Sequence, residues 1–447
     1  MKQILSAFCL AACGAACAVG LPPVVSDVSY VQSSNNKTVA ISYELANGPA
    51  IVTLDLTTNR TSIGSAYVQN TLSGAVNRVV ANGRHTIWWH PLEAWPSNKV
   101  ESGSVRFAVK AWSTADPPDY MVVNLLADTG GEDRVRYYAT TNDLPGGLFA
   151  NQVYRKTSLV MRRIRAKGIP WTMGSSASEH NHRSEEVQHV VTMTNDYWIS
   201  IFPVTQKQFT TVYGPFTFSW KKNAEMRPAE SLSLARLRHG SSDTANWSNH
   251  WPNPPGDGSF LKKLNDRTGL SFDLPGDAQW EYACRAGTHD NQWGDGTYFT
   301  ISTNHKNEDT AADLPGRYQA NGAVWTGSEY AWPSRDTTEP EDGGTPIVGS
   351  YAPNRWGLYD MHGGVWEFVL DHPQTDISAL TKGEVNANGH WLLDGSGTSD
   401  NCIMRGGNCG SNGEWWKARS ASRWFSTAAN SQTLIYGFRV VCNGDLK

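Results

Sequence analysis

The stretch of sequence that decides the fold is Gly357-Leu-Tyr-Asp-Met-His-Gly-Gly-Val-Trp-Glu-Phe368. It is followed by Arg405-Gly-Gly407 and by a closing Gly437-Phe-Arg-Val-Val441. Its residues follow neither the 3.6-residue period of a helix nor the alternation of a strand. Glycines around a Trp-Glu pair favour an irregular, backbone-rich turn, in which carbonyl oxygens and one carboxylate gather around a hard cation.

Length and composition limit the wider architecture and the classes of partner. A chain of 447 residues exceeds one compact core, which favours two domains and a connector. The net charge is −4 and charged residues make up 18% of the chain, so neither sign indicates a nucleic-acid partner. The 41 glycines and 19 tryptophans favour turns and aromatic packing over long helices.

The first residues are typical of a secretory signal peptide, which we place at residues 1–20. An apolar run from Ile4 to Ala12 follows Lys2 and is too short to span a bilayer. Leu10-Ala-Ala-Cys13 is also typical of a bacterial lipobox, which would attach a lipid anchor to Cys13. Cleavage near Ala18 is equally well supported. Both alternatives predict an exported protein that is periplasmic, at the cell surface or secreted.

Residues 22–115 predict an antiparallel β-sandwich of the immunoglobulin or fibronectin type. Short alternating segments such as Thr38-Val-Ala-Ile-Ser-Tyr43 and Ile51-Val-Thr-Leu-Asp-Leu56 are separated by turn clusters such as Ala81-Asn-Gly83. No cluster of titratable residues occurs in this segment, so a spacer or docking role is expected. A cell-surface protein that docks through this domain is one form of that role.

A connector at 116–156, with strand character at 120–125 and 135–138, leads to a second domain at 157–444. Two helices are expected there. One follows Pro203 and is capped by Thr205, and the other spans Pro275 to Arg285. In the second helix Trp280 and Cys284 are four residues apart, so they share one face.

Several ordered segments of the second domain resemble the formylglycine-generating enzyme family, or sulfatase-modifying-factor domains. Besides the opening stretch they are Trp171-Thr-Met-Gly-Ser175, Tyr197–Gln206, Asp273–Gly287, Arg405-Gly-Gly407, Arg419-Ser-Ala-Ser-Arg423 and Gly437-Phe-Arg439. The resemblance implies a C-type-lectin-like fold with little regular secondary structure. Together with the sandwich it gives an α+β chain.

The resemblance also implies two structural calcium sites. The implied ligands are Asn321, Gly322, Asp342 and Gly344 at one site, and His362, Gly363, Val365 and Glu367 at the other. The family usually has Asn at Gly364, so one side-chain contact is missing. The alternative is a set of tight turns without metal, because Gly, Asn and Asp are common turn residues.

Enzymes of the family oxidise a sulfatase cysteine to formylglycine, with oxygen and a copper ion held by two cysteines. Copper(I) prefers thiolates. The corresponding positions in this chain fall near Ser411 and Trp416. Cys409 lies near the first position, but the residue five positions later is Glu414. The copper pair is therefore incomplete, which favours a scaffold over an oxidase.

Two alternatives for the cysteines remain. The four that follow the leader are Cys284, Cys402, Cys409 and Cys442. They allow two disulfides in an exported protein, and the seven-residue spacing of Cys402 and Cys409 suits a disulfide. In the other alternative, Cys402 or Cys442 folds back to complete a displaced copper site with Cys409, and the chain is an active oxidase.

Aromatic residues gather where family members hold their substrate. The candidate ligand-binding residues are Trp415, Trp416, Arg419 and Trp424, which would stack on a glycan or anchor an exported protein. The alternative is that the tryptophans pack the core. The polar segment around His182 and His189, with several glutamates, is expected to be a solvated loop rather than a metal site.

Overall fold

The computed structural model describes residues 21–94, 104–128, 131–179, 181–221, 223–244, 253–288, 316–318, 324–325, 330–331, 344–371, 402–410, 415–426 and 430–443. Outside these residues lie the expected signal peptide with Cys13, the implied calcium ligands Asn321, Gly322 and Asp342, and the position of Ser411. The described residues form a mixed α/β structure made mostly of sheets, with few helices. None of their helices is both long and apolar enough to traverse a bilayer.

The N-terminal part consists of two antiparallel sheets. One has the order β1 (Val24–Gln32), β2 (Val39–Ala46), β7 (Gly83–Trp89), β5 (Leu72–Gly74). In the other, β3 (Ala50–Thr58) pairs with β4 (Thr61–Ser62), β6 (Arg78–Val80) and β8 (Val105–Ser113). Strand β2 alternates buried and partly buried residues, and its inward Ile41 and Tyr43 join Leu54 of β3 in one hydrophobic cluster. The short helices here are α1 (Ser65–Val68) and α2 (Pro91–Ala94).

A six-stranded sheet forms the centre of the chain. Its order is β10 (Val135–Tyr138), β9 (Tyr120–Asn124), β11 (Ser158–Ile164), β14 (Tyr197–Ser200), β24 (Val441–Cys442), β15 (Phe272–Asp273). The strand character predicted near residues 120–125 and 135–138 is confirmed. Segment 116–156 therefore supplies two strands of this sheet. Strand β24 lies between β14 and β15, so the C-terminal end of the chain closes the sheet.

Four helices pack beside this sheet: α3 (Val153–Lys156), α4 (Gln206–Tyr213), α5 (Phe260–Thr268) and α6 (Asp277–Arg285). The predicted cap of α4 is confirmed, because Thr205 Oγ1 accepts a hydrogen bond from the backbone N–H of Gln208 at 3.2 Å. Helix α6 is buried along its whole length. Trp280 and Cys284 are both fully buried, as their shared face predicts.

Short strands carry the motifs of the C-terminal part. The smaller pairs are β12 (Pro170–Met173) with β13 (His189–Thr192), β16 (Gly316–Arg317) with β19 (His362–Gly363), and β17 (Val324–Trp325) with β18 (Tyr330–Ala331). A four-stranded sheet has the order β22 (Trp424–Ser426), β21 (Cys402–Arg405), β20 (Trp366–Phe368), β23 (Tyr436–Gly437). The short helical turns named below are η4 (Ser184–Glu186) and η9 (Trp415–Ala418). The opening stretch Gly357–Phe368 thus supplies both β19 and β20.

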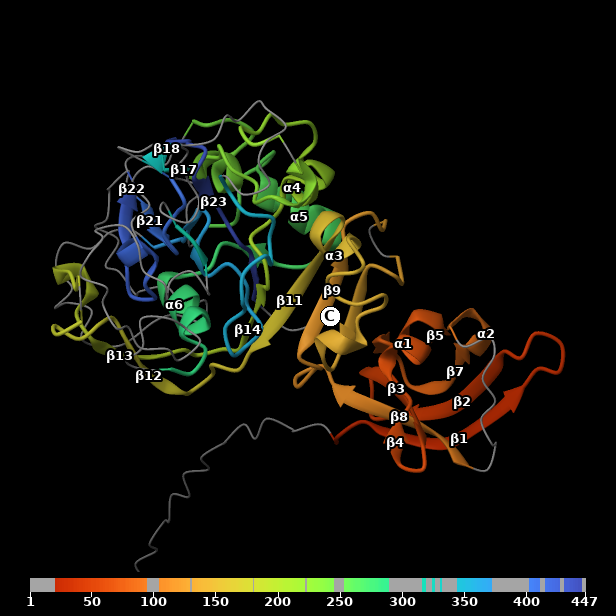
Figure 1. Ribbon diagram of the computed structural model, residues 1–447. Helices are drawn as coiled ribbons and strands as arrows, with labels where there is room; N and C mark the ends of the chain where they lie inside the picture. The colour runs from red at the N-terminus through yellow and green to blue at the C-terminus, as the bar shows by residue number, and fades with distance from the viewer. Residues whose placement is uncertain are drawn as a thin grey trace, which may run out of the picture.

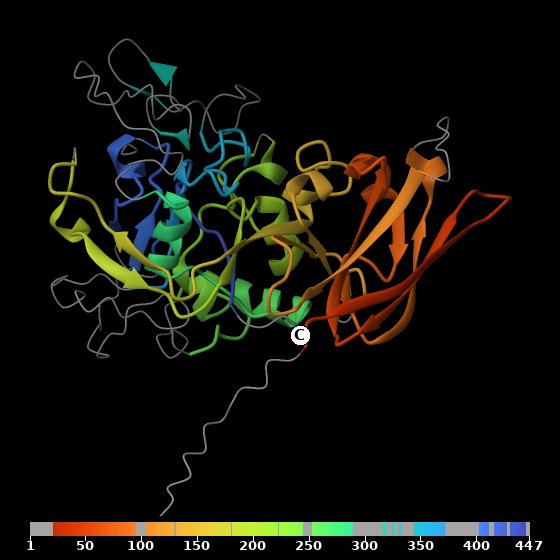
Figure 2. The ribbon, with the colours of Figure 1, turned by 90° about the horizontal axis from the view of Figure 1, so that it is seen from below.

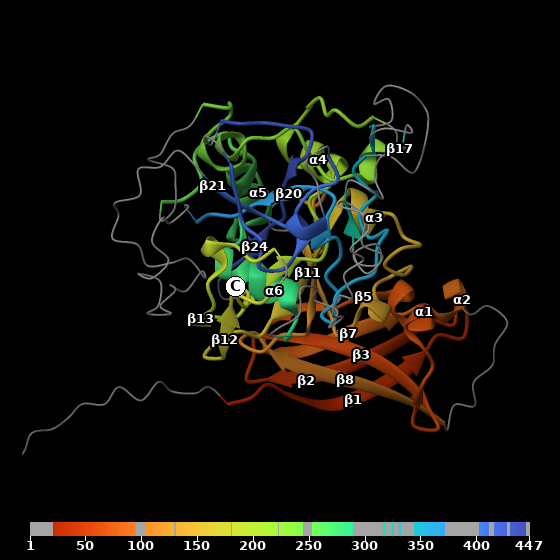
Figure 3. The same ribbon diagram turned by 60° about the vertical axis from the view of Figure 1, so that its left-hand side comes forward.

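The N-terminal sheets lie against the rest of the chain along β9 and β10 (Figures 1 and 2). Ile51 of β3 belongs to the hydrophobic cluster that contains Met121 of β9 and Tyr137 of β10. The backbone N–H of Tyr137 donates to Asn77 O at 2.8 Å, and Arg136 donates to Val76 O at 2.7 Å. Figure 3 shows the N-terminal sheets below the body that contains α6, β20 and β21.

A candidate binding face and its buried ion pairs

The Trp-Glu turn ends in a buried ion pair. One carboxylate oxygen of Glu367 accepts from Trp280 Nε1 at 2.7 Å and from Arg439 Nε at 2.6 Å, and the other accepts from Arg439 Nη2 at 2.8 Å. Glu367 is 1% exposed and Arg439 is fully buried. The carboxylate that the family resemblance assigns to calcium is thus held by a guanidinium and an indole, and a cation would have to share it with both.

The other described residues of the implied calcium sites lie close to Arg317. Gly363 and His362 pair with β16, and the side chain of Arg317 donates to Gly344 O at 3.2 Å. Gly363 has a φ of +83°, and a Cβ atom there would lie 1.9 Å from Arg317 O. Val365 is 1% exposed. The structure therefore brings Gly344, His362 and Gly363 together around one arginine.

The four cysteines are thiols, so the expected disulfide between Cys402 and Cys409 is wrong. Cys402 packs into the main hydrophobic cluster from β21, and Cys442 packs into the same cluster from β24. Cys409 Sγ instead donates to Gly364 O at 3.0 Å. The left-handed glycines Gly406 and Gly407 turn the chain between Cys402 and Cys409. The seven-residue spacing could not reveal that the two cysteines lie in different surroundings.

Cys409 is fully buried, and burial raises the pKa of its thiol to about 12. Cys284 is also fully buried, 3.6 Å from His362 Nε2 and 3.5 Å from Ser420 Oγ, and burial raises its pKa to about 12. Copper(I) binds thiolates rather than thiols. Since Trp416 stands at the second family position, the described residues do not fit a two-thiolate copper ion.

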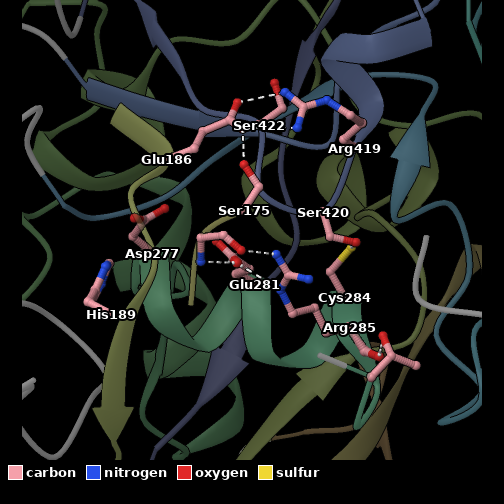
Figure 4. A network of polar contacts seen from close by, with 12 residues as sticks. Ser175, Glu186, His189, Asp277, Glu281, Cys284, Arg285, Arg419, Ser420 and Ser422 are labelled. Carbon is pink, nitrogen blue, oxygen red and sulfur yellow. Dashed lines mark hydrogen bonds and ion pairs between the residues drawn. The ribbon is translucent and has the colours of Figure 1, made fainter. Parts of the chain in front are cut away.

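Helix α6 carries two buried carboxylates, Asp277 and Glu281, which Figure 4 shows together with Arg285. Three arginines pair with them. Arg405 pairs with Asp277 and with Glu281, the latter at 3.0 Å. Arg423 Nε lies 2.8 Å from Asp277 Oδ2, and Arg285 Nε lies 2.8 Å from Glu281 Oε1. Burial would raise the pKa of Asp277, but Arg405 and Arg423 hold it at about 2.

Arg419 fastens the segment 175–189, which is largely exposed, as the sequence favours, but is anchored to the fold through the buried Glu186. Its guanidinium donates to both carboxylate oxygens of Glu186, at 2.8 and 2.9 Å, and to Asn181 O at 2.8 Å. Glu179 pairs with the same guanidinium. Arg419 and Glu186 are both fully buried. Arg419 is thus a structural residue in the described part, although the sequence suggests ligand binding.

The candidate tryptophans divide into two kinds. Trp415 is buried against Tyr318 and Ala418. Trp416 and Trp424 are half-buried, and Trp424 stacks on Trp366 with ring centroids 5.9 Å apart. Only Trp416 and Trp424 of the four predicted ligand-binding residues are therefore placed to reach solvent. The sequence did not indicate the ion pairs of four other buried arginines, although all four stand in the motifs quoted above: Arg285, Arg405, Arg423 and Arg439.

Comparison with known proteins identifies the family of the second part of the chain. Residues 155–444 match the family model of the sulfatase-modifying factor enzyme 1-like domain. The formylglycine-generating enzyme of Thermomonospora curvata is 36% identical over 106 residues, which are 24% of this chain and 29% of that protein. That of Streptomyces coelicolor is 27% identical over 173 residues, 39% of this chain and 47% of that protein. The matches thus span less than half of each relative.

Among solved structures, PvdO from Pseudomonas aeruginosa aligns with 64% of this chain and 94% of its own, at 20% identity and a TM-score of 0.43. The family model covers well over half of this chain. The chain therefore belongs to the sulfatase-modifying factor enzyme 1-like family, whose curated relatives here are formylglycine-generating enzymes.

Proposed function

We propose that this chain is a binding scaffold for a protein or glycan, built on the fold of formylglycine-generating enzymes, and that it does not perform their oxidation. The observation that carries the proposal is the geometry of Cys409. Its thiol is buried and donates a hydrogen bond to Gly364 O, and Trp416 occupies the position where a second thiol is needed.

Two physical costs oppose copper binding at Cys409. Burial raises the pKa of the Cys409 thiol to about 12, so the thiol is protonated at neutral pH and copper(I) would have to displace its proton. To coordinate the ion, Cys409 would also have to break its hydrogen bond to Gly364 O. A single thiolate, even if exposed, lacks the opposed partner that copper(I) requires for tight binding.

The face around Trp416 and Trp424 supports a binding role. Trp424 is held by its stack on Trp366, and the ammonium of Lys417 lies over the rings of Trp416 and Trp424. Aromatic rings that are fixed before a ligand arrives lose little conformational entropy on binding. Half-buried tryptophans of this kind form the anchoring contacts of many protein and glycan interfaces.

Calcium remains part of the proposal as a structural ion. Because Arg439 and Trp280 hold Glu367, we propose that one calcium ion relies on backbone oxygens of the turn at His362–Val365. The ligands proposed for a second ion are Asn321, Gly322, Asp342 and Gly344. Addition of the chelator EGTA is expected to lower the unfolding temperature, and calcium to restore it. An unchanged unfolding temperature after complete chelation would remove calcium from the account.

The oxidase alternative is tested by an aldehyde assay. The purified chain is incubated with copper(I), oxygen and a sulfatase peptide of the pattern Cys-x-Pro-x-Arg, beside an active formylglycine-generating enzyme as the positive control. Mass spectrometry is expected to find no aldehyde with this chain. Aldehyde that disappears in the Cys409→Ser variant would overturn the proposal and establish an oxidase.

A further inference from the structure

Two cations lie on the half-buried tryptophans of the binding face. The guanidinium of Arg183 lies 4.6 Å from the ring centroid of Trp416. The ammonium of Lys417 lies 5.2 Å from the ring of Trp416 and 4.8 Å from that of Trp424. We call Arg183, Trp416, Lys417 and Trp424 the aromatic-cationic patch.

The buried ion pairs set the position of Arg183. Arg419, only two residues after Lys417, donates to Asn181 O at 2.8 Å and pairs with Glu186. These contacts hold the chain on both sides of Arg183. The patch is therefore assembled from two segments more than two hundred residues apart, and it is fixed before any ligand arrives.

The position of Arg183 over the ring of Trp416 leaves N–H donors of its guanidinium available to a ligand. A guanidinium that lies over an aromatic ring keeps its five N–H groups at its edge, where they can donate to a carboxylate in pairs. The Arg183 side chain is 41% exposed. Its ion pair with Glu185 is long, at 3.8 Å, while Glu179 and Glu186 are engaged by Arg419.

We propose that the aromatic-cationic patch binds a carboxylate-rich segment of a partner protein. This inference rests on the proposed binding function and specifies its ligand. A neutral glycan would need a bare indole face to stack on, whereas cations already lie over both tryptophans of the patch. A carboxylate can instead pair with Arg183 without displacing it from Trp416, whereas Lys417 is buried and lies over the rings from within the fold.

The test uses fluorescently labelled oligoglutamate and oligoglutamine peptides with the full chain. We expect the oligoglutamate peptide to bind, and more weakly as salt rises. Arg183→Gln is expected to weaken that binding about tenfold, the effect of losing one charge-assisted contact. Arg165→Gln is the matched control, because Arg165 is also an exposed arginine in an ion pair, with Asp119.

The variant Arg183→Lys separates charge from geometry, since it keeps the positive charge and loses the paired N–H groups. Binding intermediate between wild type and Arg183→Gln is expected. Equal binding of the two peptides, or equal affinity in wild type and Arg183→Gln, would overturn the inference. Neutral oligosaccharides that bind in a Trp416-dependent way would overturn the carboxylate ligand but keep the binding function. Aldehyde in the assay above would remove the binding function itself.

Discussion

Arg405 is the residue on which the buried ion pairs depend most. It lies between Asp277 and Glu281 and is fully buried, as are both carboxylates. Removal of one member of such a group leaves buried charges without compensation. Arg405→Met is therefore expected to lower the free energy of unfolding by about 3–5 kcal/mol, measured by urea denaturation.

The control for this variant is Lys262→Met in α5. Lys262 pairs with Asp266 at the surface, where solvent screens the interaction and the pair contributes little to stability. If the two substitutions lower the free energy of unfolding equally, the buried ion pairs of Arg405 do not stabilise the fold more than a surface pair does.

The low pKa of Asp277 predicts a specific loss of stability in acid. Its pKa in the folded chain, about 2, lies below the ordinary value near 3.9, so the folded state binds the proton less well than the unfolded state. The stabilisation is complete above about pH 4 and is lost as the pH falls towards 2. For this one group it is roughly 2 kcal/mol.

Urea denaturation at a series of pH values between 6 and 2 measures this loss. The variant Asp277→Asn is expected to be less stable near neutral pH, because Arg405 and Arg423 lose their charged partner, and to show a flatter fall in acid. An unfolding midpoint in wild type that stays constant down to pH 3 would contradict the assignment.

Local features of single residues were predictable from the sequence, and their distant partners were not. The cap at Thr205 and the shared face of Trp280 and Cys284 depend on neighbours within four residues, and both are confirmed. The ion pair of Arg419 with Glu186 joins positions 233 residues apart. No periodicity reports such a contact, so the sequence does not show that this largely exposed segment is anchored at Glu186.

Among the elements, the parallel pair β16 and β19 depends most closely on a glycine. Gly363 has a φ of +83°, and its Cβ position lies 1.9 Å from Arg317 O. Gly363→Ala must therefore separate the two strands as well as strain the backbone. It is expected to lower the free energy of unfolding by more than about 3 kcal/mol.

Gly168→Ala provides the comparison, because Gly168 has a similar φ of +71° and no atom within 4 Å of its Cβ position. Only the backbone strain remains there, which costs about 1 kcal/mol. Thermal unfolding of both variants measures the difference. Equal losses would mean that the close approach of β16 does not matter.

The elements of the six-stranded sheet show where sequence reasoning stops. Strand character was visible in β9 and β10, but their segment was expected to be a connector between domains. Their assignment to the central sheet depends on the pairing of β9 with β11, and β11 in turn pairs with β14. The cysteines show the same limit, since their spacing suits a disulfide. In the fold, Cys402 instead packs into the main hydrophobic cluster and Cys409 donates a hydrogen bond to Gly364 O.

At the scale of the whole molecule, the N-terminal sheets and the central sheet share a hydrophobic cluster. Ile51 is fully buried in it beside Met121 and Tyr137. The two parts are therefore expected to unfold in one transition, and Ile51→Ala to lower the stability of the whole chain by about 2–5 kcal/mol.

Differential scanning calorimetry measures this coupling. Ile41→Ala is a matched control, because Ile41 is equally buried but lies in the separate N-terminal cluster. We expect each variant to show a single unfolding transition that moves as a whole to a lower temperature. Two resolved transitions, of which only the first shifts, would show that the parts are independent.

The central claim is that this member of the family lacks the paired sulfur ligands of a copper enzyme. Titration of the reduced chain with copper(I), followed by X-ray absorption at the copper edge, tests it directly. The expected result is weak binding without a two-sulfur coordination shell. A tightly bound copper(I) ion with two cysteine sulfurs, lost in the Cys409→Ser variant, would contradict the claim.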